Sequence, residues 1–254
     1  MTCTARQVVS DGLGMAQYPV GTCESSDLGD HIMGVVALAW CTDDGIDRWG
    51  ESWARHGSID MRFRAQLIAG LDLTITTERG PKSSDVIVRG SDGTTFATGV
   101  LRPGPTAPFT SSRRPPSEPH PVPPVAELLD SYQFHPIGFD HVAERDLRFT
   151  EGLERADSWS RNGWAHPAWL ASAANAIIRH NVAFEDGGYW VQAGVTVDLH
   201  RPIQDGARLV AAGQVNELFQ RSTHRFMVCD VSICEDGAPA ASIRSTSVFG
   251  SAIA

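Results

Sequence analysis

The chain has 254 residues, a formal net charge of −9 and a hydrophobic fraction of 42%. This length allows one large or two small folded units with a sizeable core, and the hydrophobic fraction excludes disorder throughout. The acidic balance argues against nucleic-acid binding, because that function needs a basic surface and the arginines here are scattered among acids. We therefore expect a small-molecule or protein partner.

The N-terminal sequence MTCTARQVVSDG lacks the apolar run of a signal peptide. No stretch approaches the roughly 20 apolar residues that cross a bilayer, so we expect a cytoplasmic protein without membrane contact. The five cysteines are odd in number and have no C-x-x-C spacing. Neither a disulfide framework nor a zinc site is indicated, and we expect no metal.

A proline-rich tract at 103–124 reads PGPTAPFTSSRRPPSEPHPVPP. Its prolines remove backbone donors and favour extended polyproline geometry over packed helix or strand. We predict a linker here, joining an N-terminal unit at 1–102 to a C-terminal unit at 125–254. A ligand for an SH3-type domain is the alternative interpretation of the tract.

The two halves repeat one pattern at an offset of 136 residues. The segments 58–73 and 194–209 read SIDMRFRAQLIAGLDL and GVTVDLHRPIQDGARL, and Phe63 then matches Leu199. Both alternate apolar with polar residues, as half-buried strands do. Each half is therefore expected to contain a long strand, a turn and a further strand in the same order.

An apolar helical run precedes each long strand. These runs are DHIMGVVALAWC at 30–41 and HPAWLASAANAII at 166–178. Downstream, Asp-Gly pairs at 92–93 and 236–237 predict hairpin turns between antiparallel strands. One apolar helix and several half-buried strands are compatible if each sheet wraps around its helix, which makes the expected fold class α+β.

This order resembles the hotdog fold, and two copies in one chain resemble a double hotdog. The helix HPAWLASAAN at 166–175 is similar to the second-half helix of the acyl-CoA thioesterase II family, which runs His-Arg-Ala-x-Leu-Ala-Tyr-Ala-Ser-Asp. The downstream LHRP at 199–202 is similar to that family's Phe-His-Arg-Pro. The resemblance implies an enzyme that acts on an acyl thioester of coenzyme A or of an acyl carrier protein, with no further cofactor. A homodimer is compatible with it.

The chain departs from the family's hydrolytic residues. The family's catalytic Asp corresponds to Asn175, which cannot act as a general base near neutral pH but can orient water or donate to an oxyanion. The family's Gln falls near Ser245, and its Ser or Thr falls near Gln192. The enoyl-CoA hydratase signature Asp-x4-Asn-x2-His is also absent from the sequence.

These departures favour addition to, or elimination from, a 2-enoyl thioester in fatty-acyl or secondary metabolism. The nucleophile would be water or an amine such as glycine, as in thioesterase-like double hotdog proteins that add amines to enoyl thioesters, sometimes with release of the acid. A plain acyl thioesterase is one alternative. A double hotdog that only binds acyl chains or acts as a scaffold is another.

His56 is the first candidate for a general acid or base, since an imidazole exchanges protons at neutral pH. It is the pseudo-equivalent of Gln192, and we expect it at a strand start that faces the helix of His166 and Asn175. The N-terminus of that helix would polarise the thioester carbonyl. The alternatives are a surface position for His56, a helix cap for His166 and structural bracing for Asn175.

Three further residues are candidates for substrate binding. Gln192 is expected in a second pseudo-site without chemistry of its own. Arg62 should point away from the face of Phe63, where it would bind a phosphate or carboxylate or remain solvated. Trp169 should line an acyl tunnel or belong to the core.

Overall fold

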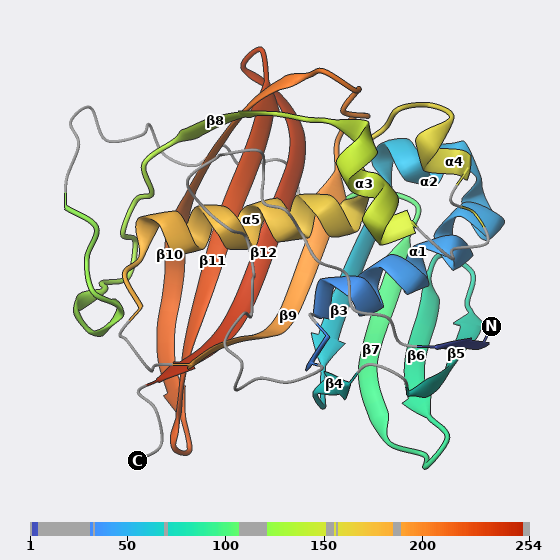
Figure 1. The fold of residues 1–254 in the computed structure, drawn as a ribbon, viewed down its shortest axis with the longest axis horizontal. Coiled ribbons are helices and arrows are strands. Elements are labelled where there is room, and N and C mark those ends of the chain that lie inside the picture. The colour runs from blue at the N-terminus through green and yellow to red at the C-terminus, as the bar shows by residue number, and fades with distance from the viewer. Residues whose placement is uncertain are drawn as a thin grey trace.

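The structure is a computed structural model that describes residues 2–4, 31–32, 34–68, 71–106, 121–150, 155, 157–184 and 189–250. Within them, ten antiparallel strands form one sheet in the order β1-β5-β6-β7-β3-β9-β12-β11-β10-β8 (Figure 1). The N-terminal strands are β1 (Thr2–Thr4), β3 (Ser58–Phe63), β5 (Asp72–Arg79), β6 (Ser84–Gly90) and β7 (Thr95–Arg102). The C-terminal strands are β8 (Ile137–Asp140), β9 (Tyr189–Leu199), β10 (Arg208–Arg221), β11 (His224–Glu235) and β12 (Ala238–Gly250). A separate small pair is formed by β2 (His31–Ile32) and β4 (Leu67–Ile68).

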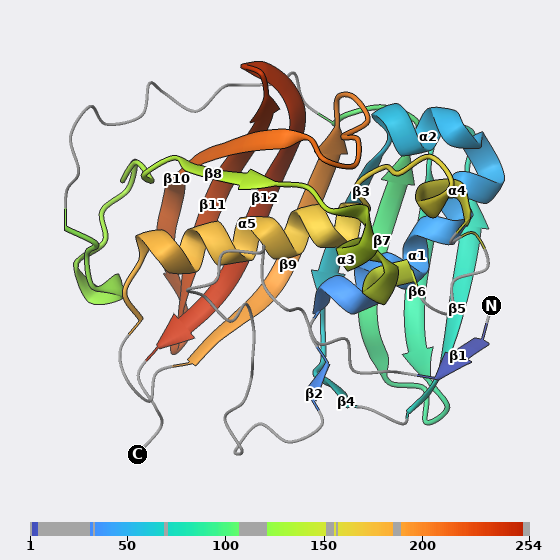
Figure 2. The same ribbon diagram turned by 45° about the horizontal axis from the view of Figure 1, so that its top comes forward.

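Two long helices lie across the same face of this sheet, one over each half (Figures 1 and 2). They are α1 (Gly34–Trp49) and α5 (Pro167–Asn181). The shorter elements are α2 (Glu51–His56), η1 (Val125–Glu127), α3 (Ala143–Thr150) and α4 (Asp157–Ser160). The expected α+β double hotdog architecture is confirmed, with each antiparallel half of the sheet covering its own central helix.

The predicted repeat is visible in the strand register at the junction of the halves. Strand β3 pairs with β9, so the two halves form one continuous sheet. Asp60 pairs with Thr196, which lies 136 residues later in the chain. If a pseudo-two-fold axis relates the two halves, it must pass between two equivalent residues that pair across β3 and β9. Asp60 and Thr196 are such a pair, so the register agrees with the offset found in the sequence. The strand order is also the same on both sides, read outward from the junction.

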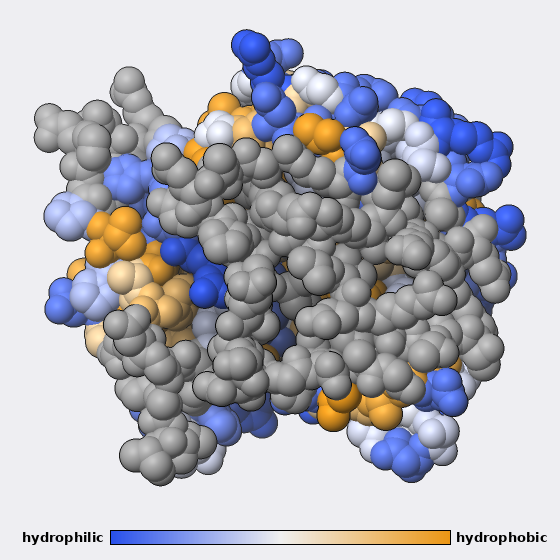
Figure 3. Space-filling view, in the orientation of Figure 1, coloured by the Kyte–Doolittle hydropathy of each residue, from blue (hydrophilic) through white to orange (hydrophobic). Residues whose placement is uncertain are grey.

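Small and apolar side chains let the helices pack closely on the sheet. Leu38 of α1 and Ile177 of α5 are fully buried, as are Ala171, Ala173 and Ala174. Each buried Leu or Ile contributes roughly 1.5–3 kcal/mol relative to its exposed state. Among the described residues visible in Figure 3, polar side chains predominate around the edge of the view and apolar ones form patches between them.

The glycines of the two Asp-Gly turns have the backbone conformation predicted from the sequence. Gly93 and Gly237 adopt positive φ angles of 84° and 76°, as the predicted Asp-Gly hairpin turns require. Residues 107–120 of the predicted linker lie outside the described residues, and the proposed domain limits stay a prediction. No helix within the described residues is long and apolar enough to cross a membrane.

Candidate functional site

Three polar side chains meet between α5 and the C-terminal half of the sheet. Gln192 of β9 donates from Nε2 to Asn175 Oδ1 of α5 at 3.1 Å and to Ser245 Oγ of β12 at 3.2 Å. The Ser245 hydroxyl in turn lies 3.4 Å from Asn175 Oδ1. We call these three residues the amide cluster. The cluster thus brings Asn175 together with Ser245 and Gln192. These are the positions that the resemblance matches to the Gln and to the Ser or Thr of the thioesterase family.

A β-bulge explains why Gln192 faces the helix. Thr246 pairs with Gly194 but Ser247 pairs with Gln192, so Ala193 is an extra residue in β9. Val195 and Val197 are buried on the inner face, and strict alternation would turn Gln192 outward. The extra residue reverses this alternation, and such bulges are common beside active sites.

Strand β12 adds a second serine to the same face. Ile243, Ser245, Ser247 and Phe249 alternate inward, and each is at most 2% exposed. The Ser247 hydroxyl is buried and has no hydrogen-bond partner among the described residues. Since buried polar groups are usually hydrogen-bonded, the unpaired Ser247 hydroxyl is a candidate group for contact with a polar ligand.

The amide cluster carries no ionisable side chain. Its free hydrogen-bonding groups in the described structure are Asn175 Nδ2 and Gln192 Oε1, and the unpaired Ser247 hydroxyl lies beside the cluster on β12. These groups can donate to a carbonyl oxygen and accept from a nucleophile, but none of them can remove a proton near neutral pH. The cluster is therefore suited to binding and polarising a neutral group.

His166 lies at the start of α5, away from solvent. Its Nδ1 accepts the Ala168 N–H at 3.1 Å, which leaves the proton on Nε2. Nε2 lies 3.2 Å from Thr42 Oγ1, whose hydroxyl donates to the Ala39 carbonyl at 2.7 Å. Both ring nitrogens are thus occupied in a helix-capping arrangement, the alternative that the sequence left open.

The expected role of the α5 N-terminus in polarising a thioester is not supported by its surroundings. The N–H of His166 already donates to Asp146 Oδ2 at 2.6 Å, and the N–H of Ala168 donates to the His166 ring. Trp159 packs edge-on against that ring, with centroids 4.9 Å apart. These contacts leave no room for a carbonyl at the His166 and Ala168 donors.

A buried ionic pair holds α3 against the same helix end. His141 is fully buried, with Nε2 3.3 Å from Asp146 Oδ2 and Nδ1 2.8 Å from the Gln204 carbonyl. Burial lowers the pKa of His141, but the hydrogen bond and charge of Asp146 outweigh it and leave that pKa raised. The pair also anchors Trp169, whose ring centroid lies 4.8 Å from that of His141.

The burial of His166 predicts an acid sensitivity. Desolvation lowers its pKa to about 3, whereas an unfolded chain has a His pKa of about 6.5. The unfolded state therefore binds the proton first, and stability falls as pH drops from about 6.5 toward 3, by up to ~1.4 kcal/mol per pH unit. Urea unfolding of wild type and His166→Asn at several pH values should show a steeper acid loss in wild type, because Asn caps a helix without titrating. Equal slopes would contradict this assignment.

His56 is not brought to the amide cluster. It ends the helix α2, so the first-half strand starts later than expected, at Ser58. The side chain is exposed, with Nδ1 3.0 Å from the His200 carbonyl. Gln192 lies near the start of β9 and His200 directly follows its end, so the two are about 25 Å apart at the usual rise per residue. Strands β3 and β9 are antiparallel, so the start of β3 lies beside the end of β9. His56 therefore lies near the end of β9, whereas Asn175 contacts Gln192 near its start.

The structure also places Arg62 and Trp169 outside the amide cluster. Arg62 pairs with Asp60 at 2.8 Å and points to the face opposite Met61, which is buried under the helices. Trp169 is 3% exposed and packs against Phe139 with centroids 6.0 Å apart. These positions match two of the alternatives predicted from the sequence, a solvated Arg62 and a Trp169 that belongs to the core. Ser247, by contrast, was not among the candidates, although its place in the alternation of β12 was a usable signal.

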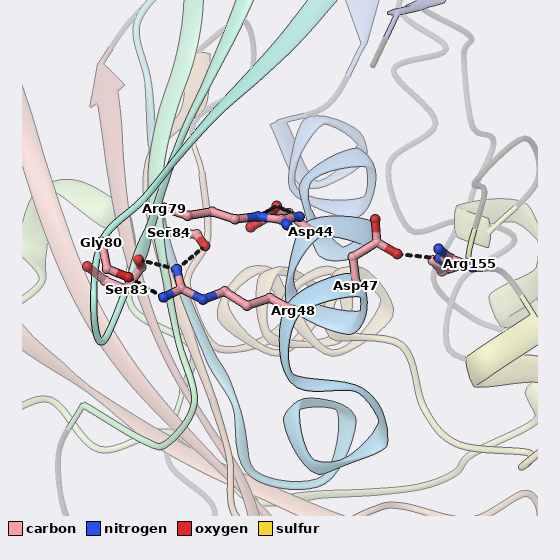
Figure 4. Close-up of polar contacts among 8 residues, drawn as sticks. All are labelled: Asp44, Asp47, Arg48, Arg79, Gly80, Ser83, Ser84 and Arg155. Atoms are coloured by element: carbon pink, nitrogen blue, oxygen red, sulfur yellow. Dashed lines mark hydrogen bonds and ion pairs between the residues drawn. The ribbon is translucent and has the colours of Figure 1, made fainter.

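The N-terminal half has a second polar region, around α1. A cavity of about 370 Å³ is lined in part by Asp43, Asp44, Asp47 and Arg79. Figure 4 shows Asp44 facing Arg79, at 2.7 Å, and Asp47 facing Arg155. In the same figure Arg48 reaches the turn between β5 and β6, where it donates to Ser84 Oγ at 2.8 Å and to the carbonyls of Gly80 and Ser83. The contacts of Asp44 and Arg48 hold α1 on its sheet, and that of Asp47 joins α1 to Arg155, between α3 and α4. Within the described ranges no group of His, Cys, Asp or Glu could hold a metal ion.

Comparisons with known proteins identify the fold. No protein-family model and no curated protein matches the chain. A conserved hypothetical protein of Mycobacterium tuberculosis, Rv0216, reported to have a double hotdog fold, is similar with a TM-score of 0.57 and 11% identity, over 98% of this chain and 96% of that one. A protein of Chloroflexus aurantiacus described as a MaoC domain dehydratase has a TM-score of 0.54 and 11% identity, over 88% and 83% of the two chains. At such identity the likeness shows the fold alone, and the chain is a double hotdog.

Proposed function

We propose that the chain is an enzyme that converts an acyl thioester carried by coenzyme A or by an acyl carrier protein, with the amide cluster as its site. The main support for this proposal is that hydrogen bonds join Asn175, Gln192 and Ser245 in the folded chain. These positions are far apart in sequence and were singled out by the resemblance to a thioesterase family. The similar structure described as a dehydratase supports chemistry of the addition and elimination type.

The neutral character of the cluster favours conjugate addition over hydrolysis. Attack of an amine on the β-carbon of a 2-enoyl thioester moves the electron pair of the double bond to the thioester oxygen. Donors such as Asn175 Nδ2 then stabilise the enolate oxygen, as oxyanion-hole groups do. The α-carbon takes up a proton, and the ammonium formed on the nucleophile loses one to water. The carrier supplies the thioester, and no further cofactor is invoked.

Hydrolysis is the second candidate, because Gln192 Oε1 and the Ser247 hydroxyl offer acceptors for a water molecule. Without a carboxylate, however, the cluster lacks the general base that water needs near neutral pH. A neutral amine is a much stronger nucleophile than neutral water, so it depends less on a protein base. A scaffold that binds acyl chains without chemistry would give neither reaction.

The test follows the two products separately. Crotonyl-CoA with glycine should lose enoyl absorbance without release of free thiol, whereas butyryl-CoA should release little thiol. Ser245→Ala should slow the addition by about tenfold or more, the effect of a lost hydrogen bond in a catalytic cluster. Thr246→Ala is the matched control, since this neighbour faces the other side of β12 and should keep the wild-type rate. Thiol release from butyryl-CoA that depends on Ser245 would favour hydrolysis, and no turnover of either thioester would refute the proposal.

A further inference from the structure

A row of aromatic and cationic residues lies next to the amide cluster on the same face of the sheet. Arg225 pairs with Phe249 and Phe249 with Trp190, so these three residues lie side by side across β11, β12 and β9. Directly opposite residues in a sheet share a face, and Phe249 is buried toward α5. The adjacent row contains Met227, Ser247 and Gln192 in the same order. We call this second row the inner row, and the row of Arg225, Phe249 and Trp190 the outer row.

An arginine guanidinium group lies over each aromatic ring of the outer row. The guanidinium carbon of Arg179, on α5, lies 5.9 Å from the Trp190 ring centroid, and that of Arg225 lies 4.7 Å from the Phe249 centroid. Guanidinium groups stacked on rings keep their N–H edges available for carboxylate or phosphate oxygens. Neither arginine pairs with an acid in the described residues, although the chain has 30 acidic and 21 basic side chains. We call Arg179, Trp190, Phe249 and Arg225 the cationic row.

Three elements, α5, β9 and β12, contribute residues to both the amide cluster and the cationic row. On α5, Arg179 follows Asn175 by one helical turn, a rise of about 6 Å. On β9, Trp190 precedes Gln192 by two residues, about 6.7 Å. The buried Ser247 hydroxyl, which lacks a partner in the described chain, stands in the inner row beside Phe249. A ligand that reaches both rows would place a neutral polar group in the cluster and an anion about 6–7 Å away.

We infer that the cationic row is a binding subsite for a carboxylate, and this inference rests on the proposed function of the amide cluster. The spacing matches a carboxylate on the acyl group or on the incoming nucleophile, both of which lie a few bonds from the thioester carbonyl. The phosphate of a phosphopantetheine arm lies much farther from its sulfur. Arg179 and Arg225 hold the carboxylate, and the aromatic rings hold the two guanidinium groups in place.

Three comparisons identify the carboxylate. Adipyl-CoA against hexanoyl-CoA, compared by Kd because neither saturated thioester can undergo addition, tests an acyl carboxylate. Glycine against ethylamine, both with crotonyl-CoA and compared by KM, tests one on the nucleophile. Arg179→Gln and Arg225→Gln should raise the Kd or KM of the carboxylate-bearing member of at least one pair by about tenfold or more, as loss of a charge-assisted hydrogen bond does. The uncharged member should change little. Arg89→Gln, an exposed arginine on β6 that removes the same charge, should leave all four unchanged.

The third comparison replaces coenzyme A with N-acetylcysteamine, which carries no phosphate. The subsite requires the Arg179 effect to persist with this carrier, and an effect seen only with coenzyme A thioesters would show phosphate recognition and overturn the proposal. Equal effects on charged and uncharged members, or none, would also overturn it. Calorimetric titration with adipyl-CoA and hexanoyl-CoA separates the two hypotheses. Preferential binding of adipyl-CoA that Arg179→Gln abolishes, in a protein without turnover, would uphold the subsite while the proposed reaction fails.

Discussion

Asn175→Ala should lower turnover of the preferred thioester by about 10²–10³-fold, the usual cost of removing one oxyanion donor. Asn175 is the member of the amide cluster with a free Nδ2 on the described residues, and it is half-buried. Gln192 keeps its bond to Ser245 when Asn175 is lost, so the free energy of unfolding should fall by only about 1 kcal/mol. Steady-state kinetics and urea unfolding of the same preparation measure both quantities.

Asn181, on the last turn of α5, offers the matched control. Its side chain is fully buried, accepts the His135 N–H at 2.6 Å and donates to the carbonyls of Ile177 and His135. Asn181→Ala should therefore destabilise the protein strongly while the folded fraction keeps its turnover per molecule. If Asn175→Ala instead unfolds the chain and leaves the rate of the folded fraction intact, Asn175 only braces the helix.

The features predicted from sequence depend on periodic patterns. The alternation at 58–73 and 194–209 and the apolar helical runs predicted the repeated α+β order and the offset that pairs Asp60 with Thr196, and the resemblance of that order to a known fold gave the double hotdog. The resemblance also singled out the three positions of the amide cluster, because helix and strand residues of one half occur in a fixed order. Asn175, Gln192 and Ser245 meet in the structure, whereas the expectation that each helix faces strands of the other half had put Gln192 in a separate pseudo-site.

The assignments that depended on geometry across the two halves could not be predicted in the same way. His56 was matched to Gln192 by the repeat, but Gln192 lies in a strand, whereas His56 ends α2. The bulge at Ala193 leaves no mark in the apolar pattern, although it decides which way Gln192 faces. Burial of His166 depends on Trp159 and Asp146, which reach it from segments with no periodic relation to α5.

Asp146→Ala should be among the most destabilising single changes in the chain, with a loss of about 3–5 kcal/mol in the free energy of unfolding. The variant removes the acceptor of the His166 N–H and the counter-charge of His141, and both histidines are fully buried. Loss of either contact leaves a polar group unsatisfied in the core, which costs more than the contact itself contributes. The expected fall in Tm is on the order of 10 °C for a chain of this length.

The matched control is Asp140→Ala, which removes the same charge from an exposed position at the end of β8 and should change Tm by little. A second readout separates the ionic pair from simple packing. Asp146 holds the pKa of His141 above its ordinary value, so the pair stabilises the fold at lower pH and loses that contribution as pH rises through the raised pKa. Asp146→Ala should therefore be most destabilising near pH 6 and less so near pH 9. A penalty that is the same at both pH values would show that α3 is held by packing against α5 and that the His141 charge contributes nothing.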